Sequence, residues 1–174
     1  MKRFFTSGVL MAALAVTACT NPARFGADGS ASGGIGAGGA TGAIVPGSAI
    51  DPTSTAYFQQ AVGDRVLFAV DQSTLTDIGR ATLDGQANWL ITNIDYTAVI
   101  EGHADEQGTR EYNLALGARR ANAAQEYLIS KGVLASRLRV ISYGKERPIE
   151  VCSDEACYAK NRRAVTVLAG GLTS

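Results

Sequence analysis

Short apolar runs alternate along the chain with longer segments whose apolar residues recur at helical spacing. Each run is rich in apolar and β-branched residues and is short enough for one strand. The runs predicted as strands are Arg65–Val70, Tyr96–Gly102, Leu138–Tyr143 and Arg163–Leu168. The segments predicted as helices are Thr76–Asn93, Thr109–Lys131 and a short one at Ser153–Asn161. Gly132 is well placed to end the second helix.

This alternation predicts an α/β (α+β) two-layer sandwich, in which a small mixed sheet carries helices on one face. The strands alternate apolar and polar positions, which is typical of a sheet with only one covered face. The predicted core residues of the first long helix are Ile78, Leu83, Ala87, Leu90 and Ile91, together with Trp89.

Residues 1–18 have the pattern of a secretory signal peptide. Lys2 and Arg3 precede the mostly apolar segment Phe4–Val16, which is shorter than the roughly 20 residues that a membrane span needs. Cys19 follows Ala18 in a pattern that resembles the bacterial lipobox, so Cys19 is the predicted lipidation site. Several acyl chains together would anchor the protein firmly. The alternative is ordinary cleavage after Ala18 without lipid.

Residues 19–52 form a predicted flexible tether, and residues 53–174 form one predicted domain. The tether is rich in Gly, Ala and Ser and has no apolar period, so it cannot bury enough surface to offset the entropy of ordering. The chain has 16 basic and 16 acidic residues, so no broad electrostatic field favours nucleic acid. Binding is therefore expected from local geometry.

Charged and glycine-rich residues separate the second predicted strand from the long helix. Asp105 lies at the carboxyl end of that strand, Gly108 permits a tight turn, and Thr109 is a predicted N-cap. Ligands tend to bind at such strand ends, because helix N-termini present free N–H groups there. Arg120 shares a helix face with Asn113, and its side chain is expected to lean back toward the turn that carries Asp105.

Asp105 and Arg120 are therefore candidates for the two sides of one binding cleft. An ammonium would donate to Asp105 and a carboxylate would accept from Arg120, so a free amino-acid head group suits the pair. Gly117 is predicted to give the ligand room, and Asn113 and Leu116 or Gly117 lie on the same helix face as Arg120. The alternative is a surface ion pair between Asp105 and Arg120 that contributes little.

Residues 101–123 (EGHADEQGTREYNLALGARRANA), 142–148 (SYGKERP) and 157–165 (CYAKNRRAV) carry a resemblance to a known family. They resemble the OmpA-like peptidoglycan-binding domain, and within that family the peptidoglycan-associated lipoproteins, over Arg65–Leu168. The resemblance implies a βαβαβαβ domain that holds the meso-diaminopimelate of peptidoglycan stem peptides and has no cofactor. The pocket residues it implies are Asp105 for the ammonium, Arg120 for the carboxylate, and Asn113, Leu116, Phe68 and Asp71 around them. For Asp71, a structural turn or capping role is the alternative.

The same resemblance implies a non-enzymatic outer-membrane lipoprotein that faces the periplasm and links the membrane to the cell wall. The implied partners are TolB and the Tol complex, and the implied role is envelope integrity and constriction at cell division. Thr20 stands where an Asp commonly retains lipoproteins in the inner membrane, which favours the outer membrane. The alternative is an OmpA-like module of a secretion or flagellar system. A wall-cleaving enzyme would need a catalytic acid for which no candidate is evident.

Cys152 and Cys157 admit three interpretations. If Ser153 caps the short helix, the two cysteines occupy the positions that meet in a hydrophobic staple, and a disulfide could replace that contact. An oxidising periplasm favours the disulfide. A zinc site with remote ligands and a pair of free thiols are the alternatives.

Two polar clusters have a less specific meaning. Glu101, His103 and Asp105 alternate, so they share one strand face and could bind a metal, but no second histidine completes a catalytic site. No metal site is therefore predicted. The pair Arg162–Arg163 begins the last strand, where the family resemblance implies an arginine that fixes the pocket edge. Surface pairing with nearby acidic residues is the alternative.

Overall fold

The structure, a computed structural model, describes residues 44–170. Its elements are α1 (Thr55–Tyr57), the π-helical turn η1 (Phe58–Gly63), β1 (Arg65–Leu67), α2 (Asp77–Thr92), β2 (Tyr96–His103), α3 (Arg110–Ser130), the 3-10 turn η2 (Ala135–Arg137), β3 (Leu138–Gly144), α4 (Glu155–Asn161) and β4 (Arg163–Gly170). The predicted signal peptide, the lipidation site Cys19 and most of the predicted tether lie outside the described residues. Within residues 44–170, no helix combines the length and the apolar character that a bilayer span requires.

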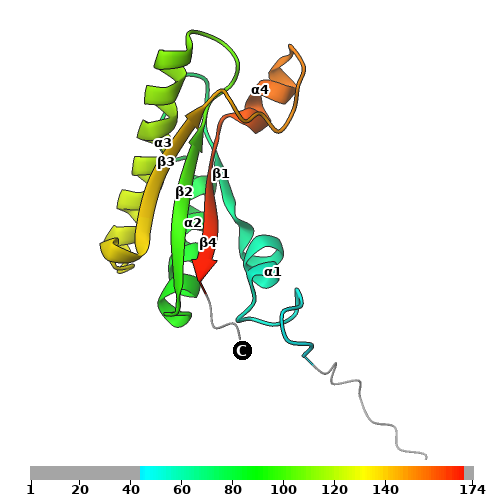
Figure 1. Cartoon of the computed structure of the whole chain (residues 1–174), viewed down its shortest axis with the longest axis vertical. Coiled ribbons are helices and arrows are strands. Elements are labelled where there is room, and N and C mark those ends of the chain that lie inside the picture. Colours follow the sequence, from blue (N-terminus) through cyan, green and yellow to red (C-terminus); the bar gives the residue numbers. More distant parts are fainter. Residues whose placement is uncertain (1–43, 171–174) are drawn as a thin grey trace, which may run out of the picture. The chain divides into compact units, whose positions relative to one another are not determined.

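The four strands form one mixed sheet in the order β1-β4-β2-β3 (Figure 1). β4 pairs antiparallel with both β1 and β2, and β2 pairs parallel with β3. Strands β1, β2 and β3 therefore run in one direction, and their carboxyl ends lie at the same edge of the sheet. Figure 1 shows α4 and the amino end of α3 at this edge.

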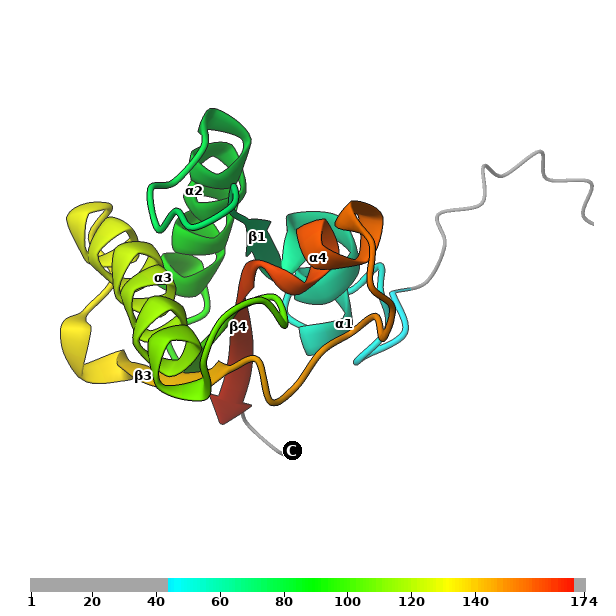
Figure 2. The same cartoon turned by 90° about the horizontal axis from the view of Figure 1, so that it is seen from above.

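Helices α2 and α3 lie on the same side of the sheet (Figure 2). Along β2, Ala98 and Ile100 are buried, whereas Thr97 is exposed and Val99 is half-buried. This period of two leaves the other face of the sheet only partly covered. The predicted two-layer α/β class, with a small mixed sheet, is confirmed.

The long helix α3 begins and ends near the predicted residues. The hydroxyl of the predicted N-cap Thr109 accepts from the N–H of Tyr112 at 3.2 Å. Gly132 follows the helix with a φ of 104°, a left-handed conformation that stops helices readily at glycine. Local capping chemistry therefore fixes the length of this helix.

The core stripe of α2 is narrower than predicted. Its buried apolar residues are Leu83, Ala87, Trp89 and Leu90. Ile78 and Ile91, which the helical spacing assigned to the core, are 83% and 44% exposed. A helical period identifies a stripe of positions, but the packing of neighbouring elements decides how much of that stripe is covered.

Strand β1 ends at Leu67 and not at the predicted Val70. The chain then turns, since the N–H of Gln72 donates to the carbonyl of Ala69 at 3.2 Å and Asp71 has a left-handed φ of 54°. The apolar run continued past the strand because its next residue, Phe68, is buried in the core for packing.

Hydrogen-bonded turns precede α1 in a part of the chain that was predicted as tether. Asp51 accepts from the N–H groups of Gly47 and Thr53, both at 2.9 Å, and the Ser54 hydroxyl donates to the carbonyl of Ser48 at 2.6 Å. The folded part therefore begins before the predicted boundary at residue 53. Composition could not show this, because Gly, Ser, Asp and Pro are common in tethers and in ordered turns alike.

Candidate functional site

A cavity of about 230 Å³ lies where the carboxyl ends of β1 and β2 meet the amino end of α3. Its lining residues are Val70, Asp71, Asp105, Gln107, Gly108, Tyr112, Asn113 and Leu116. Four of the predicted site residues, Asp71, Asp105, Asn113 and Leu116, are among them. The other three, Phe68, Gly117 and Arg120, are buried and do not belong to the lining.

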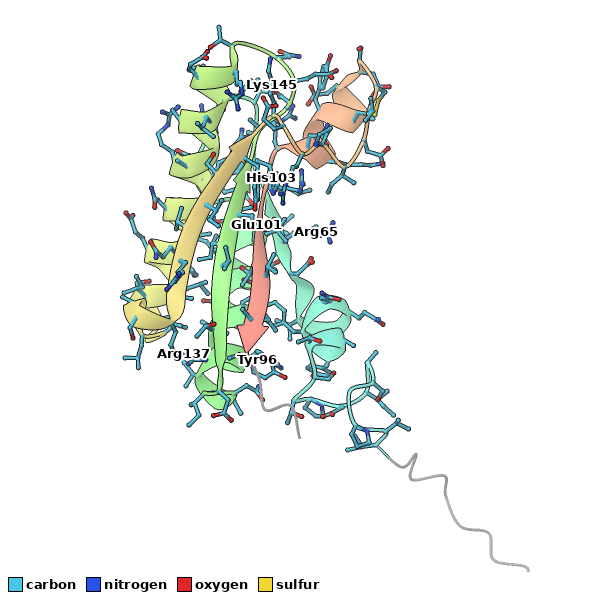
Figure 3. All side chains as sticks on the ribbon, viewed as in Figure 1. Arg65, Tyr96, Glu101, His103, Arg137 and Lys145 are labelled. Carbon is cyan, nitrogen blue, oxygen red and sulfur yellow. A yellow bond between two sulfur atoms is a disulfide. The ribbon has the colours of Figure 1, made fainter. Side chains whose placement is uncertain are left out.

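The loop between β2 and α3 is held in shape by several side chains. Asp105 Oδ1 accepts the N–H of Gln107 at 3.3 Å, and Asn113 Nδ2 donates to the Gln107 carbonyl at 2.7 Å. Lys145 Nζ donates to the carbonyl of Gly108 at 2.7 Å, and Figure 3 shows Lys145 at this end of the sheet. Gly108 has a φ of 90°, which residues with a side chain rarely adopt. One wall of the cavity is therefore pre-formed.

Arg162, at the junction of α4 and β4, is the ion-pair partner of Asp105. Its Nη1 lies 3.1 Å from Asp105 Oδ2, while its Nη2 pairs with Glu155. Asp105 is only 7% exposed. Burial acts to lower the pKa of Arg162, but its hydrogen bonds to Glu155 and Asp105 outweigh burial and raise that pKa. Arg162 therefore stays charged and divides its donors between two carboxylates.

Arg120 occupies a different position from the one predicted. Its Nε, Nη1 and Nη2 donate to the carbonyls of Gln72 at 2.8 Å, His103 at 2.9 Å and Ala69 at 3.2 Å. Its guanidinium carbon also lies 5.4 Å from the ring centroid of Phe68. The predicted picture of Arg120 flanking an open cleft is therefore wrong for this structure, as is the alternative of a surface ion pair with Asp105.

Asp105 still influences Arg120 through space. Burial lowers the pKa of Arg120 to about 10, and the nearby charge of Asp105 opposes that effect. Arg120 thus keeps its positive charge at neutral pH. Three of its five N–H groups are used by the carbonyls, so the guanidinium retains donor capacity behind the cavity wall.

Asp71 and Tyr112 form a contact across the cavity. The sequence did not predict this contact. The Tyr112 hydroxyl donates to Asp71 Oδ1, and this bond raises the pKa of Tyr112. Asp71 is one of the residue types that tolerate a left-handed backbone. Asp71 therefore both forms the turn and lines the cavity. Tyr112 gave no sequence signal beyond its place in the first turn of a helix.

Gly117 does not shape the cavity. A Cβ built on Gly117 would lie 2.8 Å from the carbonyl oxygen of Gly102 and 2.5 Å from the Ser142 hydroxyl. The lack of a side chain at Gly117 therefore lets α3 approach β2 closely. The prediction that Gly117 gives room to a ligand is wrong, because the room is taken by the neighbouring strand.

Glu101, His103 and Asp105 do not form a cluster of potential metal ligands within residues 44–170. The ring of His103 is buried, its Nε2 lies 3.6 Å from Glu101 Oε2, and its centroid lies 5.5 Å from that of Tyr143. Figure 3 shows Glu101 and His103 following one another along β2. Burial, and after it the charges of Arg163 and Arg147, lower the pKa of His103 to about 4. His103 is therefore neutral at physiological pH.

Cys152 and Cys157 are joined by a disulfide, with their Cα atoms 6.0 Å apart. The cap of α4 differs from the prediction, because Asp154 accepts the N–H of Cys157 at 3.0 Å and Ser153 precedes the cap. Within residues 44–170, the one cluster of potential metal ligands is Cys152, Asp154 and Cys157. A disulfide leaves those sulfurs without the thiolates that zinc requires.

A comparison with known families matches the OmpA family over residues 67–162, a range that contains every predicted pocket residue. The chain belongs to the OmpA family. Among its relatives is the "Peptidoglycan-associated lipoprotein" of Mesorhizobium japonicum, which is 56% identical over 74% of this chain and 73% of that protein. The protein of the same name from Rhizobium meliloti is 50% identical over 92% and 85%. The predicted resemblance to this family is therefore confirmed.

Solved structures agree with the sequence relatives. The crystal structure of the peptidoglycan-associated lipoprotein from Burkholderia pseudomallei has a TM-score of 0.62 and 37% identity, and it covers 69% of this chain and 98% of that one. The C-terminal domain of Helicobacter pylori MotB has a TM-score of 0.57 at 21% identity, and it covers 62% and 85%. That second likeness concerns the fold alone.

Proposed function

We propose that this protein binds peptidoglycan non-covalently through the diaminopimelate of its stem peptides. The single observation that carries the proposal is Asp105, a nearly buried carboxylate on the wall of an open cavity. Its oxygens accept one bond each, from Gln107 and Arg162, so acceptor capacity remains for an ammonium. The names of the relatives, which are peptidoglycan-associated lipoproteins, support the same ligand class.

The carboxylate of the same ligand end would lie toward α3. The amino end of this helix borders the cavity through Gly108 and Tyr112, and helix N-termini attract anions. Arg120 adds a full positive charge from behind the wall. In this proposal Asp105 binds the ammonium, Arg120 and the helix end stabilise the carboxylate, and Asn113, Leu116 and Asp71 shape the groove, with Phe68 supporting Arg120 from the core.

The proposed setting is the cell envelope. A lipid on Cys19 would hold the chain in the outer membrane, with the domain facing the periplasm, and wall binding would then link the two layers. TolB and the Tol complex are the proposed protein partners, with a role in envelope integrity and cell division. The proposed role is binding without bond cleavage.

The test is a titration of the full chain with three soluble stem peptides. One carries meso-diaminopimelate, one carries lysine in its place and so lacks the terminal carboxylate, and one carries diaminopimelate with its side-chain amine acetylated. We expect binding of the first peptide and a loss of at least about tenfold for each of the others, because each lacks one charged partner. Equal affinity for all three peptides would reject the ligand assignment.

A further inference from the structure

The amino end of α4 contacts the candidate site at two points. Glu155 pairs with Arg162, which donates to Asp105 at 3.1 Å. The Ser153 hydroxyl lies 3.5 Å from a carboxylate oxygen of Glu106, in the loop that follows Asp105. Both contacts come from one short segment, residues 153–155, that is outside the cavity itself.

A covalent ring encloses this segment. The disulfide joins Cys152 to Cys157, and Ser153 and Glu155 both lie between them. A helix of 7 residues such as α4 is not stable by itself in water, because nucleation is costly. The disulfide and the Asp154 cap therefore keep the first turn of α4 in the shape that presents Glu155 to Arg162.

The exposure of the three charges decides what Glu155 does. Its side chain is 65% exposed, whereas those of Arg162 and Asp105 are 5% and 10% exposed. An exposed carboxylate contributes little stability through an ion pair. It does, however, take the Nη2 of Arg162 and share its Nη1 at 3.4 Å, which leaves Asp105 with a bond from Nη1 alone.

Without Glu155, Asp105 would be the only carboxylate bonded to Arg162, so Nη1 and Nη2 would both compete for its oxygens while Nε stays bonded to the Phe68 carbonyl at 3.2 Å. Arginine and carboxylate favour such a bidentate fork, which would occupy the acceptor capacity that an ammonium needs. Removing Glu155 also removes one negative charge from a cluster that should attract a cation. Both effects act in the same direction, toward weaker binding.

We propose that Glu155 is a positioning residue for Asp105 and that the Cys152–Cys157 disulfide holds it in place, so that affinity for the ligand ammonium depends on this disulfide. This inference rests on the proposed function above. A dithiol breaks the S–S bond by giving two electrons and two protons to the sulfurs, and it is itself oxidised to a disulfide. The two thiols then leave the segment that carries Glu155 without its covalent ring.

The experiment measures affinity for the diaminopimelate stem peptide and for its amine-acetylated form. We expect Glu155→Gln to weaken binding of the free-amine peptide roughly three- to tenfold, and Glu155→Asp to restore part of it. The matched control is Glu150→Gln, since Glu150 pairs with Lys160 at 3.0 Å and not with Arg162, and it should bind like the wild type. Circular dichroism checks that each variant is folded.

The second part of the experiment reduces the Cys152–Cys157 disulfide. Dithiothreitol should weaken the wild type to the level of the double variant Cys152→Ser/Cys157→Ser, which should itself not respond to the reductant. The affinity for the acetylated peptide, which lacks the ammonium, should be weak and equal in all variants. Equal losses for both peptides would show a general structural role and would overturn the inference.

The inference and the proposed function fail in different ways. If the wild type binds and Asp105→Asn does not, but Glu155→Gln and reduction leave the affinity unchanged, only the positioning role is wrong. If the wild type does not distinguish the two peptides, the ammonium assignment is wrong and the inference is rejected with it.

Discussion

The two ends of the sheet each hold an arginine beside a cavity, but the two arginines use different acceptors. At the candidate site, Arg162 donates to the carboxylates of Asp105 and Glu155. At the opposite end of β2, Arg137 donates to the carbonyls of Leu90 at 2.9 Å and Tyr96 at 2.8 Å, and Figure 3 shows Arg137 beside Tyr96 there. One arginine holds ionised groups of a candidate site, and the other caps the end of α2.

The cavity at the opposite end is the larger of the two, at about 310 Å³ against about 230 Å³. The acidic residue that lines this larger cavity, Asp95, is exposed, so its carboxylate stays solvated by water. An exposed carboxylate attracts an ammonium weakly, because water and salt screen the charge, whereas a nearly buried one such as Asp105 interacts much more strongly. By this comparison, chemistry and burial favour the smaller cavity, and not the larger one, as the binding site that we propose.

The sharpest test of this comparison replaces one aspartate by asparagine at each end of the sheet, in two separate variants. Asp105→Asn should weaken binding of the diaminopimelate peptide by about 3 to 4 kcal/mol, more than a hundredfold, because it leaves the buried end of the ligand ammonium without a charged partner and Arg162 with Glu155 alone. Asp95→Asn should leave the affinity unchanged. Isothermal titration calorimetry of both variants measures the difference, and similar losses at the two ends would contradict the site assignment.

Acid should destabilise the fold through His103. Its pKa is about 4 when folded and near 6.5 when unfolded, so the unfolded state binds a proton more readily. The contribution of neutral His103 to the free energy of unfolding should therefore be fully present above pH 6.5. It should fall by up to about 3 kcal/mol as the pH drops from 6.5 toward 4.

The control for this pH dependence is His103→Phe, which keeps a ring against Tyr143 but cannot titrate. Urea unfolding at several pH values should show a smaller slope between pH 6.5 and 4 for the variant. Parallel curves for the two proteins would show that His103 does not contribute.

The capping arginine should affect stability without affecting binding. Arg137→Gln leaves the carbonyls of Leu90, Asn93 and Tyr96 short of donors, so we expect a loss of about 2 kcal/mol in the free energy of unfolding. Arg139→Gln, at an exposed position on β3, is the matched control and should be neutral. A loss of affinity in folded Arg137→Gln protein would link the two ends and break the comparison.

The smallest expected effect concerns the contact across the candidate cavity. Tyr112→Phe removes the hydroxyl that donates to Asp71 but keeps the ring. Because both side chains are exposed, affinity should fall by no more than about threefold. A much larger loss would make Tyr112 a direct ligand contact.

The sequence predicted the local parts of the molecule well. Caps such as Thr109 and Gly132, the strands and the two long helices follow from propensities and periods within a few neighbouring residues. Asp105, placed at a strand end by the turn pattern, and Asn113, placed on the helix face of Arg120, do line a cavity. These features depend on short stretches of chain, and the sequence determined them by itself.

Only the tertiary structure decided which charges meet. Arg162 reaches Asp105 across 57 positions of sequence, and Arg120 reaches the Gln72 carbonyl across 48. Such contacts depend on the order of strands and the register between them, which a local pattern does not specify. The same reason explains Gly117, whose small size could be read from the sequence but whose neighbour, β2, could not.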